Sequence, residues 1–239
     1  MRMNGKKDGV LMACYACLLV IGGLLTWLKY DYNAVKLEDV REACGYVSAS
    51  ATPVEAPKIA LTFDDGPSTA WTPALLDGLK ERGVKATFFL IGENADKNPE
   101  IVKRMAEEGH LIGNHTYSHI QLTSDNKEVF REELVKTNEI LKAITGENVT
   151  YIRPPYGSWD KSLEQDLNMF PVLWNVDPLD WCTPDAGLVM SRVLQQVEDG
   201  DIILLHDYYD TSVTAALMIV DEMKKQGYEF VTVEEILFD

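Results

Sequence analysis

Apolar runs and helical periodicity alternate along the chain from residue 58 to its end. Short apolar runs bounded by Gly, Pro or polar residues are typical of buried strands, and apolar residues three or four positions apart are typical of helices. Strands are predicted at Ile59–Phe63, Ala86–Ile91, Leu111–Asn114, Thr150–Arg153, Val172–Val176, Ile202–Leu205 and Phe230–Val233. Helices are predicted at Thr72–Arg82, Pro99–Glu108, Asn126–Ile144, Ser158–Leu167, Ala186–Val197 and Thr214–Gln226. This α/β alternation predicts a parallel sheet covered by helices, either closed as a barrel of fewer than eight strands or open and doubly wound.

The pattern before residue 58 is different. Val10–Leu28 carries no charge, and as a helix it would be about 28 Å long, close to the hydrocarbon thickness of a bilayer. Basic residues before this run favour an N-terminus inside the cell. We predict a cytoplasmic tail at 1–9, a single-pass transmembrane anchor at 10–28, a linker with a short helix at 29–57, and an extracellular domain at 58–239. The alternative is a signal peptide whose cleavage would leave a secreted domain.

Charge narrows the range of partners. The chain has 22 basic and 38 acidic residues, a net charge of −16. Residues 1–57 contain six of each, so the whole excess (16 − 32 = −16) lies in 58–239. Such a surface argues against nucleic acid or a soluble polyanion as a partner. Four cysteines are too few for a disulfide scaffold, although Cys44 and Cys182 could pair outside the cell.

Candidate metal ligands follow two of the predicted strands. Asp64 and Asp65 follow the first strand, and adjacent carboxylates repel unless they share a proton or bind a cation. His115 and His119 follow the third; one helical turn would put both imidazoles on one face, a spacing that suits a zinc-type ion. With Asp65 they would form a set of three ligands that leaves an open coordination position. A capped Asp-Asp-Gly turn and two surface histidines are the simpler alternatives.

Polar clusters also follow the fourth, fifth and sixth predicted strands. They are Arg153-Pro-Pro-Tyr156-Gly157, then Asp177 and Asp180-Trp181, then His206-Asp207. In parallel βα folds the active groups lie at the carboxyl ends of the strands, so these clusters should meet there. His110 precedes its strand and is predicted to be structural. Asp177 is also given a structural role, and Asp207 is given none.

Five of these segments carry a family resemblance. TFDDGP, HTYSH, RPPYG, DPLDW and LLHD, in this order, resemble the five motifs of the polysaccharide deacetylases, the NodB-homology or carbohydrate esterase family 4 enzymes. The resemblance extends from residue 58 to about 233. It implies a distorted (β/α)7 barrel of the NodB-homology type. It also implies a metal-dependent hydrolase that removes N-acetyl groups from a polysaccharide and releases acetate.

The resemblance assigns roles on the metal side of the site. Asp65, His115 and His119 would bind a divalent metal, most often zinc, with cobalt or manganese as alternatives. Asp64 would be the general base that takes a proton from metal-bound water. Arg153 would pair with this base and orient it.

The resemblance also assigns roles on the leaving-group side. His206 would be the general acid that protonates the departing amine, and Asp180 would keep this histidine charged. The backbone N–H of Tyr156 would help to hold the tetrahedral oxyanion. Trp181 and Leu204 would wall the pocket for the acetyl methyl group.

The expected substrate is N-acetylglucosamine in cell-wall peptidoglycan. Tyr156 resembles the branch of the family that acts on this sugar, and an anchored domain facing outward fits a cell-wall polymer. Chitooligosaccharides and acetylxylan are alternatives within the family. A carbohydrate-binding pseudoenzyme and a phosphatase built on a strand-end Asp pair are alternatives of other classes. The oligomeric state is not predicted.

Overall fold

The computed structural model describes residues 55–238, except for the side chains of 164–166. The predicted tail, anchor and most of the linker therefore lie outside the described residues. Among the helices of 55–238, none is long and apolar enough to cross a membrane. The described chain is an α/β unit with a curled, seven-stranded sheet whose strands are all parallel.

The longest strand, β1, has three partners in the sheet. It pairs with β6 over most of its length, and along its other edge it pairs first with β7 and then with β2. The remaining strands continue in the order β2, β3, β4, β5. The strands are β1 (Lys58–Asp64), β2 (Thr87–Leu90), β3 (Leu111–Asn114), β4 (Tyr151–Ile152), β5 (Phe170–Pro171), β6 (Ile202–His206) and β7 (Glu229–Val231).

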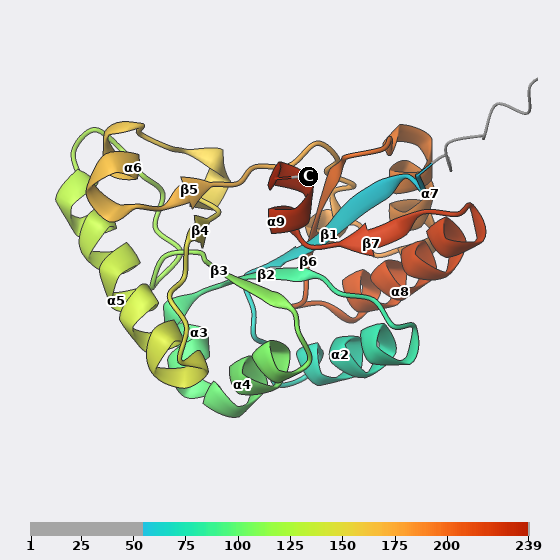
Figure 1. Ribbon diagram of the computed structural model, residues 1–239, viewed down its shortest axis with the longest axis horizontal. Helices are drawn as coiled ribbons and strands as arrows, with labels where there is room; N and C mark the ends of the chain where they lie inside the picture. The colour runs from blue at the N-terminus through green and yellow to red at the C-terminus, as the bar shows by residue number, and fades with distance from the viewer. Residues whose placement is uncertain (1–54, 239) are drawn as a thin grey trace, which may run out of the picture. The chain divides into compact units, whose positions relative to one another are not determined.

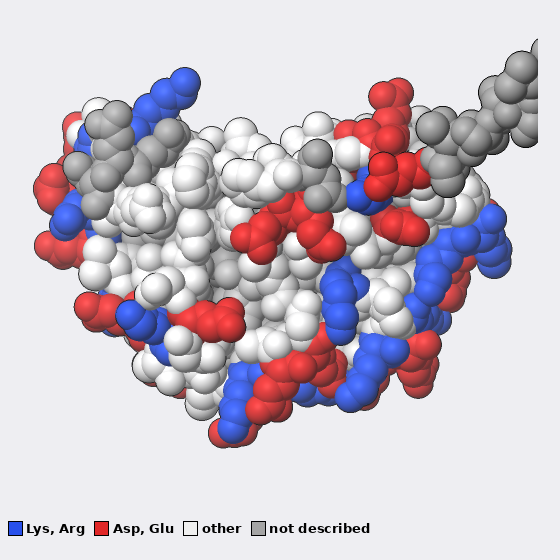
Figure 2. Space-filling view, in the orientation of Figure 1, with Lys and Arg blue, Asp and Glu red and all other residues white. Residues whose placement is uncertain are grey.

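Helices follow one another along the outer side of the sheet. Figure 1 shows α5, α4, α2 and α8 in succession, each in contact with the next. The helices are α2 (Thr72–Glu81), α3 (Gly92–Lys97), α4 (Pro99–Glu107), α5 (Lys127–Thr145), α6 (Ser162–Leu167), α7 (Ala186–Gln196), α8 (Asp210–Lys225) and α9 (Val233–Phe238), with short 3-10 turns η1 (Pro155–Gly157) and η2 (Asp180–Cys182). Acidic and basic side chains are interspersed over α2, α4 and α8 in Figure 2.

The two faces of β1 have different surroundings. Ile59, Leu61 and Phe63 are fully buried in the main apolar core with the helices, whereas Ala60 belongs to a second cluster on the other side of the sheet. Successive strand residues point to opposite faces, so Thr62 and Asp64 share the inner face with Ala60. The apolar run predicted from the sequence is therefore a strand buried on both faces, and its inner face leads to the polar cluster.

One strand and two helices were predicted at the wrong positions. The strand expected at Val172–Val176 is β5 at Phe170–Pro171, and Val176 makes only an isolated bridge to Ile203 of β6. The helix expected at Ser158–Leu167 begins at Ser162, whose N–H binds the side chain of Asp160.

The helix expected at Thr214–Gln226 begins four residues earlier, at Asp210 of α8. An acidic residue in a first turn is favoured by the helix dipole. The sequence pattern also gave no signal for α3 and α9, which are only six residues long. Such short helices have too few turns to show a periodicity.

Candidate active site

The three candidate metal ligands meet at the carboxyl ends of β1 and β3. Asp65 Oδ1 lies 3.4 Å from Nε2 of His115 and 3.4 Å from Nε2 of His119. One ligand atom from each residue lies within 4.8 Å of the others. Burial opposes ionisation of Asp65, but the nearby histidines, His115 above all, outweigh it and hold the pKa of Asp65 below its ordinary value. The residue types and their convergence match a metal site.

The protonation pattern of this group also fits a bound cation. His115 Nδ1 lies 2.6 Å from the carbonyl oxygen of Arg153, which can only accept, so Nδ1 carries the proton and Nε2 turns a lone pair toward Asp65. Asp65 Oδ1 is buried and has no hydrogen-bond partner among the described residues. Ligand atoms held about 2.0–2.2 Å from one tetrahedral ion lie roughly 3.3–3.6 Å apart, which agrees with the two 3.4 Å separations.

The HTYSH segment is not helical, contrary to the single turn considered for it. Thr116 and His119 both have positive φ, 62° and 60°, a left-handed conformation that ends any helical run. Side chains bind the loop amides instead. Asn114 Oδ1 accepts from Thr116 N–H, and Glu133 Oε2, on α5, accepts from the N–H groups of residues 117 and 118 at 3.0 and 2.8 Å. Glu133 was missed because it is one of several acidic residues in an amphipathic helix.

Arg153 holds Asp64 on one side of the metal group. Its side chain is fully buried and donates to Asp64 Oδ1 at 2.9 Å and to the hydroxyl of Thr62 at 2.6 Å. It also donates to the carbonyls of Val172 and Leu173. Burial lowers the pKa of Arg153, and Asp64 offsets part of this effect. The guanidinium thus fixes one oxygen of Asp64, while the other lies 3.8 Å from His115 Nε2.

His206 and Asp180 form a second charged pair. Asp180 Oδ1 accepts from His206 Nδ1 at 2.8 Å, and Oδ2 accepts from the backbone N–H of His206 at 2.9 Å. Burial disfavours the imidazolium, but the bond to Asp180 and the charges of Asp180 and Asp64 outweigh it and raise the pKa of His206 to about 9. His206 pairs in register with Asp64 across β6 and β1, so the two groups end neighbouring strands at one level.

The three predicted substrate-binding residues have different exposures. Tyr156 is 67% exposed and has a left-handed backbone, φ 59°. Its ring lies 5.0 Å from that of His119, edge to face, which places it beside the metal group. Trp181 is 54% exposed on η2, next to Asp180. Leu204 is almost fully buried on β6, where its N–H binds the carbonyl of Val176.

Two residues with structural or unassigned roles have clear contacts. Asp177 Oδ1 accepts from the N–H of Leu179 and shapes the turn before η2. Asp207 is fully buried and accepts from the Thr72 hydroxyl, and burial raises its pKa to about 7. The sequence showed no role for Asp207, because its contacts come from residues more than a hundred positions away.

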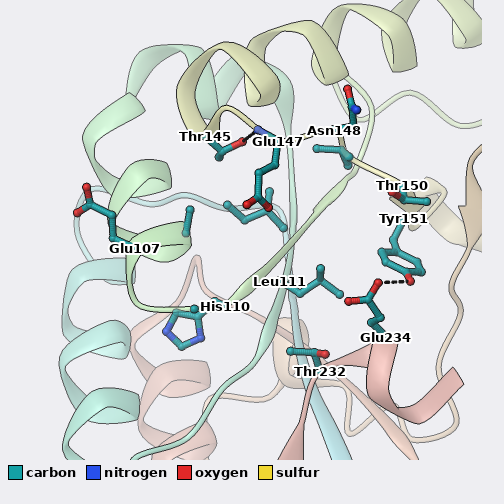
Figure 3. Close-up of a pocket in the computed structure, with 14 residues that line it drawn as sticks. Glu107, His110, Leu111, Thr145, Glu147, Asn148, Thr150, Tyr151, Thr232 and Glu234 are labelled. Atoms are coloured by element: carbon teal, nitrogen blue, oxygen red, sulfur yellow. Dashed lines mark hydrogen bonds between the residues drawn. The ribbon is translucent and has the colours of Figure 1, made fainter. Parts of the chain in front are cut away.

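A pocket of about 550 Å³ lies away from these groups, where β3 and β4 begin. Figure 3 shows its lining, including the hydrogen bond of 2.9 Å from Tyr151 to Glu234. His110 borders it, accepts from the N–H of Ala86 through Nδ1, and packs edge-on against Phe88. Burial, with a smaller effect of a nearby lysine, lowers the pKa of His110 to about 4, which keeps it neutral. These contacts suit a structural residue.

Comparison with known proteins identifies the family. Residues 51–172 match the polysaccharide deacetylase family. A peptidoglycan-N-acetylglucosamine deacetylase of Bacillus cereus is 44% identical over 197 residues, covering 78% of this chain and 70% of that protein. The chain belongs to the polysaccharide deacetylase family. PgdA of Listeria monocytogenes, also a peptidoglycan-N-acetylglucosamine deacetylase, is 40% identical over 210 residues, 84% of this chain. This chain spans only 45% of the length of PgdA.

A solved structure extends the likeness to the fold. Peptidoglycan deacetylase PdaC of Bacillus subtilis superposes with a TM-score of 0.74 at 40% identity, covering 77% of this chain and 91% of that one. PdaC is named as a peptidoglycan-N-acetylmuramic acid deacetylase and is 41% identical over 178 residues, or 74% of this chain and 38% of that protein. Relatives of nearly equal similarity are thus named for different sugars, so identity alone does not separate the two substrates.

Proposed function

We propose that this chain is a metal-dependent hydrolase that removes N-acetyl groups from N-acetylglucosamine residues of peptidoglycan and releases acetate. One observation carries the proposal: Asp65, His115 and His119 converge beside a buried Asp64–Arg153 pair, and a His206–Asp180 pair ends the strand next to Asp64. The first pair presents a carboxylate and the second an imidazolium. Amide hydrolysis needs a group of each kind, one to accept a proton and one to donate it.

Asp65, His115 and His119 would hold the metal. Zinc is the metal that two imidazoles and one carboxylate suit best, although cobalt and manganese accept the same ligands. When bound, it would supply a water molecule of lowered pKa and polarise the carbonyl group of the acetyl amide. The bond from His115 Nδ1 to the Arg153 carbonyl fixes the tautomer and orientation in which Nε2 is the ligand atom.

Asp64 would act as the general base. Arg153 binds one of its oxygens and leaves the other facing the ligand group, so the carboxylate is turned toward the place where a proton would be removed. His206 would act as the general acid that gives a proton to the departing amine. Asp180 keeps this imidazole charged, because its carboxylate binds Nδ1 and leaves Nε2–H as the donor.

The substrate would lie across the exposed groups beside the ligand set. Tyr156 would offer its backbone N–H to the developing oxyanion, and Trp181 and Leu204 would flank the acetyl methyl group. The tyrosine at 156 is the residue that favours N-acetylglucosamine over the muramic acid residue. Chitooligosaccharides, acetylxylan and the N-acetylmuramic acid of PdaC are the competing substrates.

The remaining architecture follows from the same resemblance. We infer that the curled sheet, with residues 170–176 running from β4 to β6, forms the distorted (β/α)7 barrel of the family. We also infer that residues 10–28 anchor the chain in the cell membrane and that residues 58–239 form an extracellular catalytic domain. The length of the uncharged run and the basic residues before it support this topology.

The test is acetate release by the purified full chain. Metal is removed with a chelator and zinc is restored, and acetate is measured from N-acetylglucosamine oligomers and, in parallel, from intact peptidoglycan. Zinc-dependent release from peptidoglycan would support the proposal. Faster release from free oligomers would favour a chitooligosaccharide deacetylase. Zinc binding without release from either substrate would favour a carbohydrate-binding pseudoenzyme.

A further inference from the structure

Asp207 is a buried acid that the proposed mechanism does not use. It is fully buried and directly follows the proposed general acid, His206. Oδ2 accepts from the hydroxyl of Thr72 at 2.5 Å, whereas Oδ1 has no hydrogen-bond partner in the part of the chain that the structure describes. Burying a carboxyl group with part of its bonding capacity unused costs free energy. A neighbouring group whose position depends on the Asp207 carboxyl group would explain this cost.

That contact is with the turn that presents the ligand Asp65. Gly66 follows Asp65, and a Cβ placed on Gly66 would lie 2.4 Å from Oδ1 and 2.5 Å from Oδ2 of Asp207. Real Cβ atoms do not approach oxygen so closely, so the carboxyl group packs against the bare backbone of the turn. The carboxyl group of Asp207 can therefore occupy this position only because residue 66 has no side chain.

Thr72 ties the far end of the same turn to Asp207. Its hydroxyl accepts from the N–H of Ser68 at 2.7 Å and donates to Asp207, so it links the backbone of the turn to the carboxyl group. Thr72 is also the first residue of α2. The segment from 66 to 72 is thus held at both ends by one carboxyl group that belongs to the β6 end of the site.

We propose that Asp207 is a positioning residue which, through Gly66 and Thr72, fixes the metal ligand Asp65 relative to His206. The register of β1 and β6 supports this, because Asp64 and His206 are paired and the residues that follow them diverge into the two loops that Asp207 joins. The inference rests on the proposed function, since it assumes that Asp65 binds the metal and that His206 donates a proton.

A purely structural role for Asp207 would have a different signature. If Asp207 only anchored the first turn of α2, its loss would lower the melting temperature and leave the folded site unchanged. If it positions Asp65, its loss would also weaken metal binding by the folded protein. Metal affinity measured well below the melting temperature separates the two roles.

The experiment compares Asp207→Ala, Asp207→Asn and Thr72→Val with Ser212→Ala in the full chain. Ser212 is a matched control because it is fully buried nearby on α8 and its hydroxyl has no hydrogen-bond partner among the described residues. Zinc affinity is measured by competition with a chelator, melting temperature by calorimetry, and kcat and KM by acetate release. We expect Asp207→Ala and Thr72→Val to weaken zinc binding about 10-fold or more and to lower kcat with little change in KM. Asp207→Asn, which keeps the shape and an acceptor for Thr72, should stay within a few-fold of the wild type.

Gly66→Ala gives a second, independent measurement. Alone it should weaken zinc binding as much as Asp207→Ala, and its effect should be smaller when the Asp207 carboxyl group is also removed. Zinc affinities for Asp207→Ala and Thr72→Val that equal that of Ser212→Ala would overturn the positioning role. If the wild type binds zinc but releases no acetate, the proposed function fails, and the zinc affinities still decide this proposal.

Discussion

The two charged pairs beside the candidate metal group are made from similar parts that are arranged in opposite ways. In the Asp64–Arg153 pair the cation is the more enclosed partner, with side-chain exposures of 5% and 0%. In the His206–Asp180 pair the carboxylate is the more enclosed partner, and the imidazole is 14% exposed. In each pair the enclosed residue sets the position of the one that faces the site. In the proposed mechanism, the buried member of each pair holds its partner in place, and the less buried member accepts or donates the proton.

The two pairs also differ in whether their charge can change. An arginine stays protonated throughout the usual pH range, so Asp64 is held by a permanent charge. His206 has a pKa of about 9 that depends on Asp180, and it must give up its proton if it acts as an acid. Changes on the Asp64 side should therefore affect rate and folding stability at every pH. Changes on the His206 side should alter the pH dependence.

The largest effect is expected for Asp64→Asn. The amide keeps the shape of the side chain but cannot accept a proton, and loss of a general base costs about 10²- to 10⁴-fold in rate. We expect kcat for acetate release to fall about 10³-fold while zinc affinity changes little. Asp221→Asn, which makes the same change on the exposed face of α8, is the control. A loss below 10-fold would remove Asp64 from the role of base.

Arg153→Met tests the enclosed partner of the same pair. It leaves the carboxylate of Asp64 buried without its cation, and breaking a buried pair in this way costs about 3–5 kcal/mol of folding stability. The free energy of unfolding is measured with urea. The double variant with Asp64→Asn should regain part of the loss, because no uncompensated charge then remains. Equal free energies of unfolding for the wild type and Arg153→Met would show that Arg153 is not needed to compensate the buried charge of Asp64.

Much of the site could be predicted because its residues stand at the ends of strands. A buried run such as Ile59–Phe63 is visible as a local pattern, and the fold brings the ends of parallel strands together. The ligand set follows from these strand ends, whereas the Asp64–Arg153 and His206–Asp180 pairs were implied by the family resemblance. The strand expected at Val172–Val176 was misplaced because its apolar pattern does not reveal that Val172 bonds to β4 whereas Asn175 and Val176 bond to β6, so the run does not follow one partner strand.

Contacts that join distant segments could not be predicted. Glu133 shapes the loop of His115 and His119 from α5, and Asp207 packs on Gly66 from the opposite end of the chain. Nothing in the local sequence distinguishes Glu133 from neighbouring acidic residues, and the position of Asp207 after a strand does not reveal which residues it contacts. Their importance depends on which backbone groups the fold leaves to be bound, and this is a property of the tertiary structure.

Asp180→Asn should separate the His206 side from the Asp64 side by pH. The bond and charge of Asp180 raise the pKa of His206 to about 9, so the imidazole stays protonated up to that pH. With an amide at 180 the pKa of His206 falls toward its ordinary value of about 6.5. The basic limb of kcat/KM, measured by acetate release, should therefore move to lower pH, and the loss of rate should be greatest above pH 8. A uniform loss at all pH values would contradict this role for Asp180.

The smallest effect is expected for Thr62→Val, which tests how Arg153 is held. The hydroxyl of Thr62 accepts from Arg153 at 2.6 Å and donates to the carbonyl of Ile203 at 2.7 Å. Removing it leaves both groups unsatisfied and should cost about 1–3 kcal/mol of stability. Because Arg153 keeps its bonds to two backbone carbonyls, kcat should fall by less than 10-fold.

Thr87→Val is the matched control for this last change. Thr87 is equally buried on the neighbouring strand β2, in register with Thr62, and its hydroxyl accepts from the N–H of Val233 instead of from Arg153. Its loss should lower stability by a similar amount and leave kcat unchanged. If Thr62→Val also leaves kcat unchanged, the carbonyls of residues 172 and 173 alone orient Arg153. In that case the segment between β4 and β6, and not β1, sets the position of the proposed base.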